Sequence, residues 1–169
     1  MKKLIITLAA IAVLSSCSSS SEESTETLES TENAVAEVAE PAAPVEQEVT
    51  VELESNDMMK FNKTEIFVPA GSTVTLNLTH TGKMEKAVMG HNFVLLTKGT
   101  DIPAFASTAI AAKENDYIPE SDAIIAHTGL IGGGESTSVT FEAPAPGTYQ
   151  FICSFPGHYG AMKGEFIVE

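Results

Sequence analysis

Hydrophobic and polar residues alternate with a period of two over several short segments between residues 49 and 169. In the segment STVTLNLTH, Val74, Leu76 and Leu78 occupy every second position, with threonine or asparagine between them. Side chains on a β-strand point alternately to its two faces, so this pattern predicts a strand with one buried face. The same alternation predicts two further strands, one with Val139 and Phe141 on its buried face and one with Tyr149, Phe151 and Cys153.

Turn-forming residues separate these segments. Proline or glycine occurs at residues 69–71, 82, 132–134 and 144–147, and the segment GEFIVE ends the chain as one more short strand. Short alternating strands with regular turn signals predict an all-β domain, a Greek-key β-sandwich. Residues 101–123 depart from this pattern, because they are rich in alanine at helical spacing and contain two Ile-Pro pairs. We expect a short helical insertion there.

The N-terminus has a different character. Lys2 and Lys3 precede an apolar run over residues 4–14, and small residues follow up to residue 16. This order is typical of a secretory signal peptide, and the apolar run is too short to span a bilayer stably. A buried core helix is the alternative interpretation, but it leaves the two lysines at the extreme N-terminus unexplained.

The end of the signal peptide at residues 1–16 has a sharper feature. The sequence LSSC at residues 14–17 resembles the bacterial lipobox, in which the cysteine becomes the acylated first residue of the mature protein. The resemblance implies several acyl chains on Cys17, which would anchor the protein stably to a membrane. Ser18, in place of an aspartate, implies delivery to the outer membrane, facing the periplasm or exposed at the cell surface. The alternative is an ordinary signal peptide followed by a free cysteine.

An acidic segment separates Cys17 from the alternating strands. Residues 18–48 contain nine glutamates and no basic or aromatic residue. Such a segment has too little apolar surface to fold, so residues 17–48 are expected to be a lipidated, disordered tether and residues 49–169 the folded domain. A helix through the AVAEVAE stretch is the alternative, and Pro41 and Pro44 would limit its length.

The charge balance excludes one class of partner. The chain has a net charge of −14, and residues 49–169 contain seven lysines, no arginine and fourteen acidic residues. Binding to nucleic acid relies on clustered basic residues that contact phosphates. We therefore expect no nucleic-acid partner.

The chemistry is concentrated in the segment CSFPGHYGAM near the C-terminus. It carries Cys153, His158 and Met162 at the spacing Cys-x4-His-x3-Met. His91 stands just before an apolar segment upstream and can supply a second imidazole. Two histidines, a thiolate and a weak axial thioether are the ligands of a blue-copper site. The alternative is a free thiol, a surface histidine and a core methionine that are neighbours only in sequence.

These motifs resemble those of the azurin family of cupredoxins. The resemblance rests on Gly90-His91-Asn92 upstream, on CSFPGH and MKG downstream, and on the segments SNDMMKFN, LTHTGKMEKAVMGHNFVL and IAHTGLIGGGESTSVTF, which occur in the family's order and near its spacing. It covers residues 49–169, which is essentially the whole expected domain.

The resemblance implies a role for each matching residue. His91, Cys153 and His158 would bind one copper ion, with Met162 and the carbonyl of Gly90 on opposite axial sides. The side chain of Asn92 would tie the upstream strand to the cysteine loop, and backbone N–H groups near Asn92 and Phe155 would donate to the sulfur. His80 and His127 would not bind the metal. An apolar surface for docking partners would comprise Met59, Met84, Val88, Met89, Phe155, Pro156 and Ala161.

Three departures from the family pattern leave the ligands intact. Phe93 stands where the family has a buried tryptophan, and the chain contains no tryptophan. Val49 and Gly71 stand at the positions of the family's disulfide, so other packing must replace that crosslink. The helical insertion is one residue shorter.

A site with four protein ligands leaves no open position for a substrate, unlike a catalytic metal site. We therefore expect an electron carrier and not an enzyme, since a copper reductase would need a second, histidine-rich site. The expected partners are redox proteins such as c-type cytochromes or a terminal reductase or peroxidase. The alternative is a copper-binding lipoprotein for copper storage, delivery or tolerance.

Overall fold

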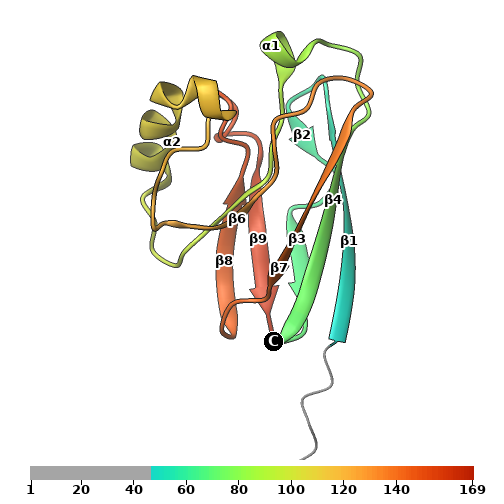
Figure 1. Ribbon diagram of the computed structural model, residues 1–169, viewed down its shortest axis with the longest axis vertical. Helices are drawn as coiled ribbons and strands as arrows, with labels where there is room; N and C mark the ends of the chain where they lie inside the picture. The colour runs from blue at the N-terminus through green and yellow to red at the C-terminus, as the bar shows by residue number, and fades with distance from the viewer. Residues whose placement is uncertain (1–46) are drawn as a thin grey trace, which may run out of the picture. The chain divides into compact units, whose positions relative to one another are not determined.

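The computed structural model describes residues 47–169 (Figure 1). The expected signal peptide, Cys17 and the expected tether up to residue 46 lie outside the described residues. The first strand, β1 (Gln47–Asn56), begins two residues before the expected start of the domain. Gln47 and Glu48 belong to it because they continue the parallel pairing with Ser72 and Thr73.

Nine strands form two sheets in the described part of the chain. One sheet has the order β2 (Lys60–Phe61), β1, β4 (Ser72–His80) and β7 (Ser136–Glu142). The other has the order β3 (Glu65–Val68), β9 (Lys163–Val168), β8 (Gly147–Ile152), β5 (Val94–Leu96) and β6 (Ile124–His127). β1 pairs with β4, and β3 with β9, in parallel register, and the other pairs are antiparallel. The predicted β-sandwich is confirmed.

The inner faces of the sheets form one hydrophobic core. In β4, Val74, Leu76 and Leu78 are fully buried, as the alternation predicted, and they pack in one cluster with Phe93 and Phe151. Val139 and Phe141 are only partly buried because β7 is the edge strand of its sheet. The buried Phe93 ring lies 5.3 Å from the Phe151 ring, so the phenylalanine fills a core position.

The predicted insertion at residues 101–123 is helical in its first part only. The helix α2 (Ile102–Ala111) is followed by the 3₁₀ turn η1 (Lys113–Asn115), and the remaining residues form turns. Asp101 caps α2 by accepting a hydrogen bond from the Ala104 N–H. Phe105 on α2 packs with Ile118, Val94, Leu96 and Ile152, so the insertion covers the outer face of the second sheet. Within residues 47–169 we find no helix with the length and hydrophobicity needed to span a membrane.

The loop after β8 and the segment before β5 meet at the end of the sandwich away from the C-terminus. β8 ends at Ile152 and β9 begins at Lys163, so the residues between them form a loop at this end, where α1 (Lys86–Met89) also lies (Figure 1). Val94 at the start of β5 pairs with Ile152. His91, just before β5, is thereby placed beside Cys153, just after β8.

Candidate metal centre

Three side chains converge at this end of the sandwich. One potential ligand atom from each of His91, Cys153 and His158 lies within 4.8 Å of the other two. The Cys153 Sγ atom is 3.9 Å from Nδ1 of His91 and 3.7 Å from Nδ1 of His158. Both imidazoles thus present the same ring nitrogen to the sulfur. His91 and Cys153 are fully buried and His158 is 4% exposed, so the cluster is almost closed to water.

The loop at residues 153–162 is folded by its own backbone hydrogen bonds. The His158 N–H donates to the Phe155 carbonyl, and the Met162 N–H donates to the His158 carbonyl at 2.8 Å. The Cys153 N–H donates to the Met162 carbonyl at 3.0 Å, which closes the loop. Gly157 has a φ of +84°, a left-handed conformation that glycine adopts without strain. These bonds hold the fully buried Met162 next to Cys153.

The orientation of His91 is set by the hydrogen bond of its other ring nitrogen. Nε2 lies 2.9 Å from the carbonyl oxygen of Asn56, which can only accept, so Nε2 carries the proton and Nδ1 has a free lone pair. Burial lowers the pKa of His91 to about 4, which keeps the ring neutral at ordinary pH. A neutral imidazole with one nitrogen tied to a carbonyl is the form that binds a metal.

Burial has the opposite effect on Cys153. It raises the pKa of the thiol to about 12, while hydrogen bonds from the backbone N–H groups of Asn92 and Phe155 act to lower it. These are the two backbone groups for which the family resemblance implied hydrogen bonds to the sulfur. Without a metal, the sulfur therefore carries a proton, and the N–H donors are in place to stabilise a thiolate once a cation binds.

Gly90 brings its carbonyl oxygen to 3.9 Å from the Cys153 sulfur. A Cβ atom at this position would lie 2.5 Å from the backbone oxygen of Lys86 and 2.9 Å from the side chain of Leu130. Only glycine therefore allows the chain to pass this close to the sulfur between α1 and residue 130. The axial role that the family resemblance implies for the Gly90 carbonyl stays a prediction.

The side chain of Asn92 ties three segments together behind the cysteine. Its Oδ1 accepts from the Ser154 N–H at 2.8 Å, and its Nδ2 donates to the Asp116 carbonyl at 3.0 Å and to Ser154 Oγ at 2.9 Å. Ser154 Oγ in turn donates to the Tyr117 carbonyl at 2.8 Å. Asp116 and Tyr117 both have positive φ angles, 53° and 61°. A strained turn after η1 is thus fixed directly to the cysteine loop, a contact that the sequence did not reveal.

A family model for copper-binding proteins of the plastocyanin/azurin family matches residues 47–169. The chain belongs to this family. It is 44% identical over 128 residues to azurin of Pseudomonas chlororaphis, covering 72% of this chain and 99% of that protein. It is 46% identical over 123 residues to azurin-1 of Alcaligenes xylosoxydans xylosoxydans, covering 69% of this chain and 95% of that protein.

Among solved structures, auracyanin A, a "blue" copper protein from Chloroflexus aurantiacus, resembles this member of the plastocyanin/azurin family with a TM-score of 0.65. The two are 38% identical, and the match covers 72% of this chain and 99% of auracyanin A. The donor set agrees with the family: two neutral imidazoles and a buried sulfur form the trigonal group of a type 1 copper site. The cofactor of this plastocyanin/azurin family member is copper.

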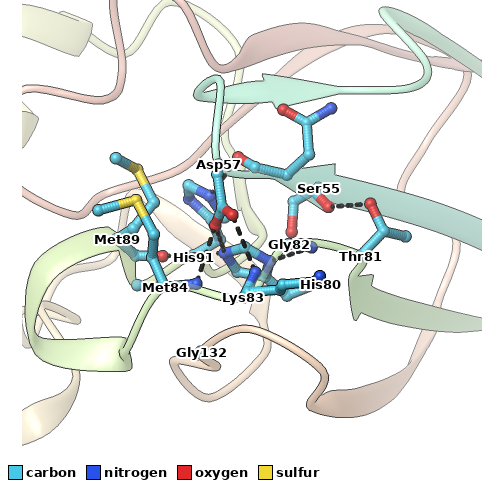
Figure 2. A network of polar contacts seen from close by, with 12 residues as sticks. Ser55, Asp57, His80, Thr81, Gly82, Lys83, Met84, Met89, His91 and Gly132 are labelled. Carbon is cyan, nitrogen blue, oxygen red and sulfur yellow. Dashed lines mark hydrogen bonds and ion pairs between the residues drawn. The ribbon is translucent and has the colours of Figure 1, made fainter.

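The remaining two histidines of the chain, His80 and His127, do not belong to the cluster of His91, Cys153 and His158. His80 is fully buried, and its ring stacks on His91 with centroids 4.5 Å apart. Nδ1 of His80 accepts from the Gly82 N–H at 2.9 Å, and Nε2 lies 3.0 Å from the Met89 carbonyl (Figure 2). Both ring nitrogens are therefore occupied by protein partners. His127 is exposed, and its Nδ1 is 3.2 Å from the Thr128 carbonyl.

The expected docking residues lie at or near the surface. Met59, Met84 and Val88 are 37%, 38% and 57% exposed, Ala161 is exposed, and Met89, Phe155 and Pro156 are half-buried. The sequence analysis missed Met58, which is 68% exposed and adjacent to Met59. It also missed Asn56, because a residue that acts through its backbone carbonyl leaves no signal in its side-chain type.

Copper binding should release one proton at neutral pH. With a pKa of about 12, Cys153 must lose its proton when the metal binds, whereas burial keeps His91 and His158 neutral by lowering their pKa values. The apparent Cu(II) affinity should then rise about tenfold per pH unit above neutrality. Calorimetry in buffers of different ionisation enthalpy measures the proton count, and release of two protons would contradict the assigned neutral histidines.

Proposed function

We propose that this protein carries single electrons between redox partners by cycling one bound copper ion between Cu(II) and Cu(I). The observation that carries the proposal is the closed, nearly dry cluster of His91, Cys153 and His158. Hydrogen bonds hold each ligand in place, so the metal can change oxidation state with little ligand motion. The bound ion supplies the redox chemistry, and the chain supplies rigid ligands and a path to the surface.

His158 provides that path. Of the three ligands it alone has any exposed surface, 4%, and its ring lies 4.6 Å from the ring of Phe155. The half-buried Pro156 and the exposed Ala161 flank it on the same loop. A small apolar surface beside an accessible ligand edge suits short-lived contacts with redox proteins. We propose c-type cytochromes or a terminal reductase or peroxidase as these partners.

The deciding experiment mixes the copper-loaded protein with a reduced c-type cytochrome under anaerobic conditions. We expect the thiolate-to-copper absorption to bleach as the cytochrome is oxidised, and to return on reoxidation with copper still bound. A copper-delivery protein would instead lose the metal to an acceptor, and the absorption would not return. Failure to exchange electrons with any small redox protein would contradict the proposal.

A charge placed on the docking surface should slow electron exchange without changing the copper site. Val88 is 57% exposed at the surface of α1, and Val88→Asp puts an unpaired carboxylate into the interface. We expect the second-order rate constant with a c-type cytochrome to fall about tenfold, from a cost of about 1.4 kcal/mol in the encounter. Ile110→Asp is the matched control, because Ile110 is 55% exposed on α2. Equal rates for both variants would refute docking at α1.

We also propose that the protein is exported and held at a membrane through lipid on Cys17, at the outer membrane and facing the periplasm or the cell surface. The support is the lipobox-like LSSC at residues 14–17 after an apolar run with two preceding lysines. The acidic residues 18–48 would then hold the copper domain away from the membrane while leaving it free to turn.

Cys17→Ser should abolish membrane attachment. The substitution removes the thiol that would carry the acyl chains, each buried methylene of which contributes about 0.8 kcal/mol to anchoring. We expect the variant to move from the membrane fraction to the soluble fraction and to lose incorporation of labelled palmitate in a bacterial host. Ser16→Ala, next to the cysteine, should keep both. Palmitate incorporation that survives Cys17→Ser would contradict the assignment.

A further inference from the structure

Four methionines lie on chain segments that adjoin the ligand His91. Met58 is 68% exposed, Met59 37% and Met84 38%, and Met89 is half-buried. They are all the methionines of residues 47–169 apart from the buried Met162. We call these four residues the thioether cluster.

Hydrogen bonds around Asp57 hold the segments of the thioether cluster together. Asp57 directly precedes Met58, and its Oδ1 accepts from the Met84 N–H at 3.1 Å. The same oxygen lies 3.7 Å from Nε2 of His80, which is 3.0 Å from the Met89 carbonyl. The Asp57 carboxylate thus bonds to the Met84 segment, and the adjacent His80 ring contacts the Met89 segment, so the flexible methionine side chains of all three segments start from one region.

The methionine side chains of the thioether cluster are exposed or lie at the edge of this network. Figure 2 shows Met84 and Met89 extending the same way past Asp57, with both sulfur atoms at the outer edge of the network. Met59 has a φ of 54°, rare for a residue with a side chain, at the turn between β1 and β2. The Met59 N–H donates to the Asn56 carbonyl at 3.1 Å, and the Met58 N–H donates to Asn56 Oδ1 at 2.9 Å. This turn thus carries two consecutive methionines whose side chains are exposed.

Thioether sulfur is a soft ligand that selects Cu(I) over harder cations, and several thioethers are needed for a useful affinity. We propose that Met58, Met59, Met84 and Met89 form a second copper site, which takes Cu(I) through their sulfur atoms at the surface. The carboxylate of Asp57 at the base of the cluster adds a negative charge that favours a cation. Binding involves no electron transfer, because the ion arrives and remains as Cu(I).

This second site is distinct from the type 1 centre in chemistry and exposure. The type 1 ligands are two imidazoles and a thiolate and are almost closed to water, whereas three of the thioether residues are more than a third exposed. A site of this kind exchanges its ion readily. The protein would then hold a labile Cu(I) ion in addition to the copper that carries electrons.

The test adds Cu(I), as its acetonitrile complex, to reduced protein that already holds one equivalent of copper, under anaerobic conditions. The full-length Cys17→Ser variant is used, so that no second thiol competes for the ion. With methionine methyl groups labelled by ¹³C, we expect the signals of the thioether cluster to shift and saturate at one added equivalent. The Met162 signal should stay in place. Competition with bicinchoninate measures the affinity.

Leucine at all four cluster positions keeps the surface apolar and removes every thioether. We expect this variant to bind the added Cu(I) more than about tenfold more weakly, while its oxidised form keeps the blue absorption. Val88→Leu is the matched control and should bind the added ion as the parent does. Single Met84→Leu and Met89→Leu variants, each with a smaller loss, guard against misfolding of the fourfold variant. Unmoved cluster signals, or equal affinity in the fourfold variant, would overturn the proposal.

Discussion

Replacing Cys153 with serine is expected to abolish the strong visible absorption of the copper-loaded protein. That absorption arises from charge transfer between the thiolate and Cu(II), and Cys153 supplies the sulfur at the centre of the ligand cluster, 3.7 and 3.9 Å from the two imidazole nitrogens. A serine hydroxyl fits the same space but is a hard, weakly acidic donor. The Cu(II) affinity should fall by more than about 100-fold, beyond the loss typical of changing a residue that only supports a ligand.

The measurement is an absorption spectrum after addition of one equivalent of Cu(II), with affinity from competition against a chelator. Cys17→Ser is the matched control, because it removes the chain's other thiol and should leave the spectrum unchanged. His127→Ala should also leave it unchanged, since that exposed histidine lies outside the cluster. A blue band that persists in Cys153→Ser would refute the site.

The fold followed from the sequence wherever one face of a strand is fully buried. Alternation in β4 predicted its buried positions because every second side chain there meets the opposite sheet. The same reasoning was less accurate for β7, where Val139 and Phe141 remain partly exposed at the sheet edge. Alternation reports which side of a strand faces inward, and it does not report how many strands flank it.

The metal centre was predictable because its ligands have distinctive side chains. Cys153, His158 and Met162 lie on one short loop, and His91 stands at the start of a strand, so residue type and spacing were enough to propose the set. The support behind the ligands was less visible. The Asn56 carbonyl that orients His91 is a backbone group, and any residue type could have provided it.

The turn at Asp116 and Tyr117 could not have been read from the sequence. Neither residue is glycine, yet both adopt positive φ angles, at a cost of roughly 1–3 kcal/mol each. The turn persists because distant groups hold it: Asn92 and Ser154 bond to its carbonyls, and the Asp116 carboxylate accepts from the Leu130 N–H at 3.1 Å. The helical part of the predicted insertion therefore ends before residue 116, and residues 116–117 turn back to the copper loop.

Asn92→Leu should destabilise the metal-free protein strongly, because this one amide satisfies groups on two other segments. Leucine has a similar size, but it leaves the buried Ser154 N–H and the Asp116 carbonyl without their partner. Each unsatisfied buried group costs about 1–3 kcal/mol, so we expect a loss of about 2–5 kcal/mol in the free energy of unfolding. Relief of the strained turn at Asp116 and Tyr117 would place the loss nearer the lower figure.

Urea unfolding of the metal-free protein measures this loss as a shift in midpoint. Asn77→Leu is the matched control: on the outer face of the sheet its amide donates from β4 to Glu52 on β1, where water can replace the lost bond. We expect the control to lose no more than about 1 kcal/mol. Ser154→Ala, which keeps the backbone N–H bond to Asn92 but removes the hydroxyl's bonds with the Asn92 amide and the Tyr117 carbonyl, should fall between the two. Equal losses for Asn92→Leu and Asn77→Leu would mean that the bonds between the copper loop and the turn contribute nothing beyond an ordinary surface contact.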